Sequence, residues 1–113
     1  MTTLHIVRQS AFNTNDFAQC LQILGNNDVI VFIDDGCYNL HHHLTKRLFD
    51  NATNNTANIS DNITDNQMFI KLHVIAQHAL ARAITVNETQ CTKIAMTDLV
   101  SLTFSNDRVI TWQ

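Results

Sequence analysis

The sequence has little of what several common functional sites require. It contains two glycines, Gly25 and Gly36, so it offers no glycine-rich loop of the kind that cradles phosphate groups. Charged residues make up 15% of the chain and form no basic cluster, which argues against direct binding of nucleic acid. No apolar run approaches the ~18 residues of a membrane-spanning helix. We therefore expect a soluble protein that binds neither nucleic acid nor a membrane.

Cysteine is also scarce, and its spacing excludes two common frameworks. The three cysteines, Cys20, Cys37 and Cys91, are odd in number, and no two of them have the spacing of a Cys-x-x-Cys motif. A disulfide framework and a structural zinc site are therefore not expected, and free thiols agree with a reducing compartment. The first residues lack the basic region and apolar core of a signal peptide. We expect a cytoplasmic protein without a metal or other cofactor.

The composition that remains is typical of one small globular domain. At 113 residues the chain has room for a single core and no second domain. Apolar residues make up 45% of it, and the net charge is -3. With so few charges, solubility depends on Asn, Thr, Gln and Ser, and a low-charge surface often means that partner proteins cover part of it.

Short apolar segments alternate with helical patterns along the chain. Strands are predicted over residues 4–8, 29–33, 68–72, 91–95 and 108–112, and helices over residues 16–24, 38–49, 74–83 and 97–104. Residues 50–67 are rich in Asn and Thr and are predicted to form a flexible loop. This alternation predicts a single three-layer α/β/α domain with a mainly parallel sheet of about five strands.

Sheets of this kind bind ligands at the loops beyond the carboxyl ends of their strands, which directs attention to residues 34–38 and to His73. We interpret Asp34 and Asp35 as turn-forming and helix-capping residues, with a Mg²⁺ site or an acid pair as the alternative. The run of histidines at 41–43 is not expected to bind a metal, because consecutive side chains on a helix point ~100° apart.

Two thiols are candidates for chemistry. Cys20 lies on the apolar stripe of the first predicted helix, which favours a buried small side chain; the alternative is a sulfur carrier, which needs an accessible thiolate. Cys37 stands at a predicted helix start, where unpaired amides favour a thiolate, but Asp34 and Asp35 beside it raise a thiol pKa. Cys91 begins a predicted strand and is expected to be inert.

Six short motifs occur in order along the chain. They are Leu4-His5, Ser10 with Phe12, Asp35-Gly36, Ala81-Arg82, Asp98-Leu99-Val100 with Leu102-Thr103, and Trp112. In this order and spacing they resemble the DsrH/TusB family, small subunits of intracellular sulfur-relay complexes. Three positions depart from the family pattern: Ala11 replaces a proline, Ala83 a glycine and Ala95 an acidic residue.

The resemblance implies a function. Such subunits are similar in fold to two sister subunits and assemble with them into a heterohexamer, in which one sister supplies the main sulfur-accepting cysteine. The resemblance implies that this chain is an accessory subunit of a persulfide relay, and the favoured pathway is 2-thiolation of the tRNA wobble uridine. It also makes Trp112 a candidate interface residue. Two alternatives stay open: an active carrier that uses Cys20 or Cys37, in tRNA thiolation or sulfur oxidation, and a stand-alone ligand-binding module that uses the 34–38 loop.

Overall fold

The computed structural model describes residues 2–25, 27–46, 71–88 and 91–113. The predicted loop at 50–67 lies outside these ranges. The strands are β1 (Thr3–Val7), β2 (Val29–Phe32), β3 (Lys71–Ile75), β4 (Thr92–Ile94) and β5 (Arg108–Trp112). The helical elements are α1 (Asp16–Gln22), the 3₁₀ helix η1 (Asp34–His41), α3 (Ala76–Ala81) and α4 (Met96–Ser105).

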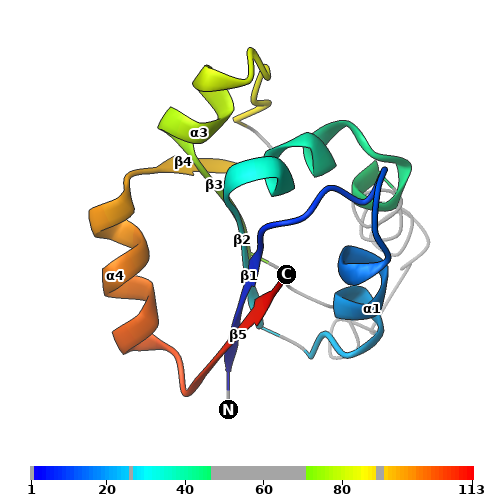
Figure 1. Ribbon diagram of the computed structural model, residues 1–113. Helices are drawn as coiled ribbons and strands as arrows, with labels where there is room; N and C mark the ends of the chain where they lie inside the picture. Colours follow the sequence, from blue (N-terminus) through cyan, green and yellow to red (C-terminus); the bar gives the residue numbers. More distant parts are fainter. Residues whose placement is uncertain (1, 26, 47–70, 89–90) are drawn as a thin grey trace, which may run out of the picture.

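The strands form one sheet in the order β4-β3-β2-β1-β5, and all four pairings are parallel. The chain moves from β1 to β4 in one direction along the sheet and then crosses back to place β5 beside β1. Because such crossovers are right-handed, this reversal places α4 on the opposite face from α1 and η1 (Figure 1). The result is the predicted three-layer α/β/α fold with a parallel sheet.

A hydrophobic cluster lies on each face of the sheet. Side chains alternate along β1, so that Val7 packs on the α1 side and Leu4 and Ile6 pack on the α4 side. The α1-side cluster is the larger and also contains Phe17, Cys20, Ile30, Phe32, Cys37, Leu72, Val74, Ala79 and Cys91. The α4-side cluster contains Val29, Val31, Ile75, Ile94 and Leu99 besides the two β1 residues. Among the described residues, α4 is the helix that packs on this second face, through Leu99 and Leu102.

Two predicted elements are misplaced. The third strand continues to Ile75, three residues beyond its predicted end, and the helix after it begins at Ala76 instead of residue 74. The segment predicted as a helix over 38–49 begins earlier, as the 3₁₀ helix η1 from Asp34, and the α-helical residues 43–46 follow it. Residues 47–49 lie outside the described part of the chain.

The shift of the third strand moves His73 away from the loops. His73 lies in the middle of β3, paired with Val31 on one side and Thr92 on the other. The prediction that it belongs to the carboxyl-end loops is therefore wrong. The reason is that the apolar run through β3 joins α3 without a Gly or a Pro to mark the boundary.

Candidate functional site

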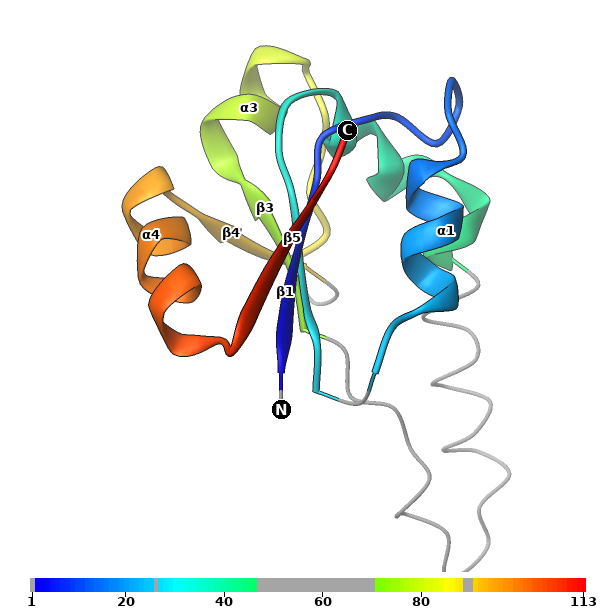
Figure 2. The same cartoon turned by 60° about the horizontal axis from the view of Figure 1, so that its bottom comes forward.

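The carboxyl edge of the sheet gathers the charged side chains that the fold brings together from distant parts of the chain. Arg8 follows β1, and Asp34 and Asp35 follow β2. His78 lies on α3, which begins directly after β3, and Arg82 comes directly after this helix. Since the strands are parallel, these ends lie at the same edge, and α3 stands there in Figure 2. Ligands of open α/β sheets bind at this edge.

Two arginine–aspartate pairs organise the edge. Arg8 Nε donates to Asp34 Oδ2 at 3.1 Å, and Arg82 Nε donates to Asp35 Oδ1 at 3.1 Å. A second nitrogen of Arg8 donates to Gln113 Oε1, also at 3.1 Å. Each pair is partly exposed, so it contributes at most about 1 kcal/mol to stability. Their main effect is to fix the Asp34–Asp35 turn against β1 and α3.

The turn itself is conformationally strained. Asp34 has a φ of 50°, in the left-handed region, where a residue other than glycine incurs roughly 1–2 kcal/mol. Its N–H donates to His78 Nδ1 at 3.0 Å, so the proton of the neutral imidazole resides on Nε2. Strained backbone of this kind is common at functional sites, but the two carboxylates are engaged by the arginines. Among the described residues, no group of three or more His, Cys, Asp or Glu side chains is placed to hold a metal ion.

Cys37 lies beneath this edge and is buried. Its Sγ donates to the carbonyl of Phe32 at 3.9 Å, and its side chain belongs to the α1-side cluster. Burial raises the pKa of the Cys37 thiol to about 11; the charge of Arg82 opposes this rise, and Asp34 and Asp35 reinforce it. The helix begins three residues earlier than predicted, at Asp34, and two N–H groups near its start already have acceptors: that of Asp34 donates to His78 Nδ1, and that of Gly36 donates to the carbonyl of Ile33.

The other two cysteines are buried as well. Cys20 lies at the sheet-facing side of α1 with none of its surface exposed, and burial, with a contribution from Asp28, raises its pKa to about 12. Burial, followed by the nearby Cys37, raises the pKa of Cys91 to about 12. A thiol must ionise to act as a nucleophile, so all three thiols are poorly suited to react in this conformation.

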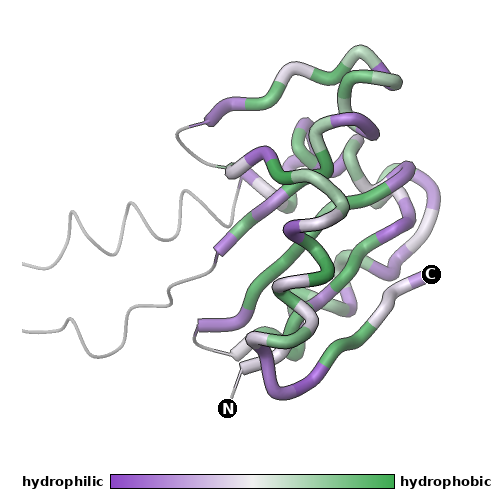
Figure 3. The backbone as a smooth tube through the Cα atoms, turned by 90° about the vertical axis from the view of Figure 1, so that its left-hand side faces the viewer, coloured by the Kyte–Doolittle hydropathy of each residue, from purple (hydrophilic) through white to green (hydrophobic). Residues whose placement is uncertain are grey.

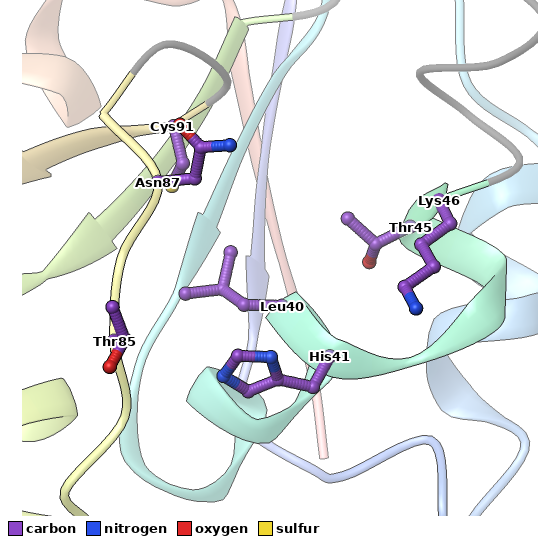
Figure 4. A pocket seen from close by; sticks show the side chains of 7 residues that line it. All are labelled: Leu40, His41, Thr45, Lys46, Thr85, Asn87 and Cys91. Carbon is purple, nitrogen blue, oxygen red and sulfur yellow. The ribbon is translucent and has the colours of Figure 1, made fainter.

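A small pocket of about 210 Å³ lies between the end of η1 and the segment that leads into β4 (Figure 4). Two cationic or titratable side chains, Lys46 and His41, stand on one wall, and Cys91 stands on the other. The full lining is Leu40, His41, Thr45, Lys46, Thr85, Asn87 and Cys91. Sequence reasoning missed this pocket, because its walls come from segments about 40 residues apart that only the sheet order brings together.

A buried polar network that the sequence did not reveal joins three elements. His5 in β1 contacts Asp28 with its Nε2 at 3.1 Å, and its Nδ1 accepts a hydrogen bond from Trp112 Nε1 at 3.1 Å. Because an indole N–H only donates, Nδ1 must be unprotonated, and His5 therefore donates to Asp28 through Nε2–H. The indole of Trp112 is thus engaged inside the subunit and stacks on His5. Its role at an interface stays a prediction.

Asp28 is the acceptor at the centre of this network. Its carboxylate accepts the backbone N–H groups of Gly25 at 2.9 Å and Thr3 at 3.1 Å, besides the bond from His5. Burial by itself would raise the pKa of Asp28, but these hydrogen bonds and His5 together hold it below its usual value. The network ties β1 to the turn before β2 and to β5.

Comparison with known proteins identifies the family. In the described part of the chain, no helix is long and apolar enough to cross a membrane. A search of curated proteins finds no match. A scan of family descriptions matches residues 9–109 to the family described as DsrH like protein. This match covers most of the 113 residues, and the parallel α/β sheet agrees with the fold that the resemblance implies. The chain belongs to the DsrH-like protein family.

Proposed function

We propose that this chain is an accessory, non-catalytic subunit of a sulfur-relay complex that serves 2-thiolation of the tRNA wobble uridine. Membership of the DsrH-like family makes it a subunit of a sulfur-relay complex. The observation that carries the accessory role is the state of the thiols: Cys20, Cys37 and Cys91 are 0%, 0% and 3% exposed. A sulfur carrier needs a thiol that its donor and acceptor proteins can reach.

The chemistry of persulfide transfer explains why burial matters. A thiolate attacks the outer sulfur of a donor persulfide; a new S–S bond forms on the acceptor, the old S–S bond breaks, and the donor leaves as a thiolate. A thiol with a pKa of about 11 or 12 is ionised at pH 7 only to roughly one part in 10⁴ or less. A subunit with such thiols supports the transfer by assembly, while another subunit accepts the sulfur.

The partners are two homologous small subunits that form a heterohexamer with this chain in the cytoplasm. The charge of -3 and the lack of a basic cluster support a subunit that does not itself hold the tRNA. The charge content of 15% supports a surface that is covered in part by other subunits.

The test is capture of the tagged full chain from its native cells, followed by native mass spectrometry with and without a thiol alkylator. We expect the chain to be recovered with two other small subunits and without a sulfur adduct of its own. Loss of the chain should also lower the content of 2-thiouridine in tRNA. A monomer would support the stand-alone ligand-binding module instead, and a sulfur adduct that Cys20→Ser removes would show an active carrier. Unchanged 2-thiouridine with intact assembly would point to sulfur oxidation.

A further inference from the structure

The pocket between the end of η1 and the segment that leads into β4 has an uncharged floor. Three lining residues that are partly or fully buried form this floor: Leu40, Thr45 and Cys91. The Thr45 hydroxyl donates to the carbonyl of Asn39 at 2.6 Å, so its proton is already engaged. Burial raises the pKa of Cys91 to about 12, so this thiol is uncharged at neutral pH. The floor therefore suits an aliphatic group.

Apolar and polar side chains alternate along the segment that leads into β4. Ile84 and Val86 pack against the α1-side cluster, whereas Thr85 and Asn87 are exposed and line the pocket. Figure 3 shows this alternation as changes of colour along the segment, at the top of the view. The N–H of Cys91 donates to the carbonyl of Asn87 at 3.0 Å, which ties the rim of the pocket to its floor. This wall therefore has a polar rim above an apolar base.

The opposite wall carries a cation. Lys46 and His41, both exposed, line it (Figure 4). Within the described part of the chain, neither side chain has a hydrogen-bond or ion-pair partner. The described lining contains no Asp or Glu, and Glu88, which follows Asn87, is paired with Lys93 at 3.0 Å. The pocket thus presents the ammonium of Lys46 and the His41 ring without a carboxylate that would compete for them.

The volume of the pocket limits its ligand to a small molecule. A cavity of about 210 Å³ corresponds to roughly seven water molecules at ~30 Å³ each. Pockets for drug-sized ligands and cofactors have roughly 300–1,000 Å³, so a nucleotide does not fit. Inorganic phosphate would fit, but some of its oxygens would face Leu40 and Cys91 without a partner, which is costly. A short aliphatic carboxylate instead places its charge at Lys46 and its chain on the floor.

We propose that this pocket binds a short aliphatic carboxylate of roughly six to eight non-hydrogen atoms. The Lys46 ammonium pairs with the carboxylate, the His41 ring donates a second hydrogen bond to it, and the aliphatic chain covers Leu40 and Cys91. The inference goes beyond the proposed function, because it assigns a ligand to a site that the transfer of sulfur by another subunit does not use.

The test is a titration of the full chain with sodium butyrate, monitored by amide NMR at low ionic strength. We expect saturable shifts at the pocket residues, with a dissociation constant of about 1 mM, and binding of the uncharged butyramide at least about tenfold weaker. Lys46→Met should weaken butyrate binding about tenfold. Lys71→Met, which removes the same charge from an exposed position outside the pocket lining, should change it less than about twofold. Both variants should unfold within about 2 °C of wild type, because both lysines are exposed.

Three results would overturn the inference. If butyrate causes no saturable shift at the pocket residues, the pocket does not bind a carboxylate. If butyramide binds as well as butyrate, or if Lys46→Met and Lys71→Met weaken binding equally, the ammonium of Lys46 does not select the ligand. If inorganic phosphate binds more tightly than butyrate, the pocket belongs to another class of anion. The proposed function stands or fails separately, by assembly and by the cysteine that carries sulfur.

Discussion

Gly36 in η1 packs directly against the backbone at the end of β1, and its replacement by alanine should strongly destabilise the fold. A Cβ atom at this position would lie 2.1 Å from the carbonyl oxygen of Val7 and 2.9 Å from its carbonyl carbon. Both are backbone atoms at the end of β1, so they cannot rotate away as a side chain would. The backbone of Gly36 has a negative φ, so the constraint is the lack of space and not a left-handed conformation.

The loss of stability in Gly36→Ala follows from the distance that η1 must move. Relief of the contact requires η1 to move roughly 1 Å from the end of β1, which loosens Cys37 and the packing of the α1-side cluster. Overpacking of this kind typically costs 1–3 kcal/mol, and here the obstacle is rigid backbone, so we expect about 3 kcal/mol. For a chain of this size that corresponds to a fall of about 10–20 °C in the unfolding temperature.

The assay is urea unfolding of wild type and Gly36→Ala, with Gly25→Ala as the matched control. At Gly25 a Cβ would come no closer than 3.6 Å to any atom, and that atom belongs to the side chain of Asp28. The control should therefore lie within about 1 kcal/mol of wild type. If Gly36→Ala is as stable as the control, η1 does not approach the end of β1 this closely in solution. The packing of Cys37 in the α1-side cluster would then be wrong as well.

Three further predictions concern other sites. Ala83 has a φ of 55° and occupies the left-handed position after α3, where the N–H groups of Ala83 and Ile84 donate to the carbonyls of Leu80 and Ala79. Ala83→Gly should therefore raise the free energy of unfolding in urea by about 0.5–1 kcal/mol, and a lower free energy of unfolding would contradict this. Asp28→Asn should lower the free energy of unfolding by roughly 2–3 kcal/mol at pH 7, because it removes a buried carboxylate that accepts three hydrogen bonds. Since folding lowers the pKa of Asp28 from 3.8, the stabilisation by this carboxylate should be lost as pH falls below 3.8, and the variant should lose less stability over that pH range than wild type. Burial, with a contribution from the charge of Lys71, lowers the pKa of His73 from 6.5 in the folded state. As pH drops below 6.5, the unfolded chain therefore binds this proton before the folded chain does, and the free energy of unfolding should fall. His73→Leu should reduce this loss of stability below pH 6.5, and a pH dependence equal to that of wild type would refute the prediction.

The fold was predictable where the sequence carried clear boundaries. The strand at Val29–Phe32 ends before two aspartates and a glycine, and α1 has its apolar residues on one face, so both were placed correctly. The end of β3 was not placed correctly, because the apolar residues Val74, Ile75 and Ala76 lead into α3 with no Gly or Pro at the boundary. The 3₁₀ helix η1 was not foreseen either. Gly36 in this helix packs against the backbone of Val7, a tertiary contact that no local pattern encodes.

The candidate site was predictable in part. The position of Asp34 and Asp35 after a strand indicated the carboxyl edge, but their arginine partners come from positions 26 and 47 residues away and depend on strand order. The apolar stripe of the first helix indicated a buried Cys20, as the structure shows. Nothing local indicated the bond between His5 and Asp28, which are brought together only by the pairing of β1 with β2. Long-range pairing is thus the part of the site that the sequence did not reveal.

The central claim is that this chain belongs to a sulfur relay without carrying the sulfur itself. The most direct measurement loads the assembled complex with a persulfide donor, traps it with an alkylator, and maps the added sulfur to individual cysteines by peptide mass spectrometry. The account predicts sulfur on a cysteine of another subunit and none on Cys20, Cys37 or Cys91, whose thiols are buried. Added sulfur on any of these three would contradict it.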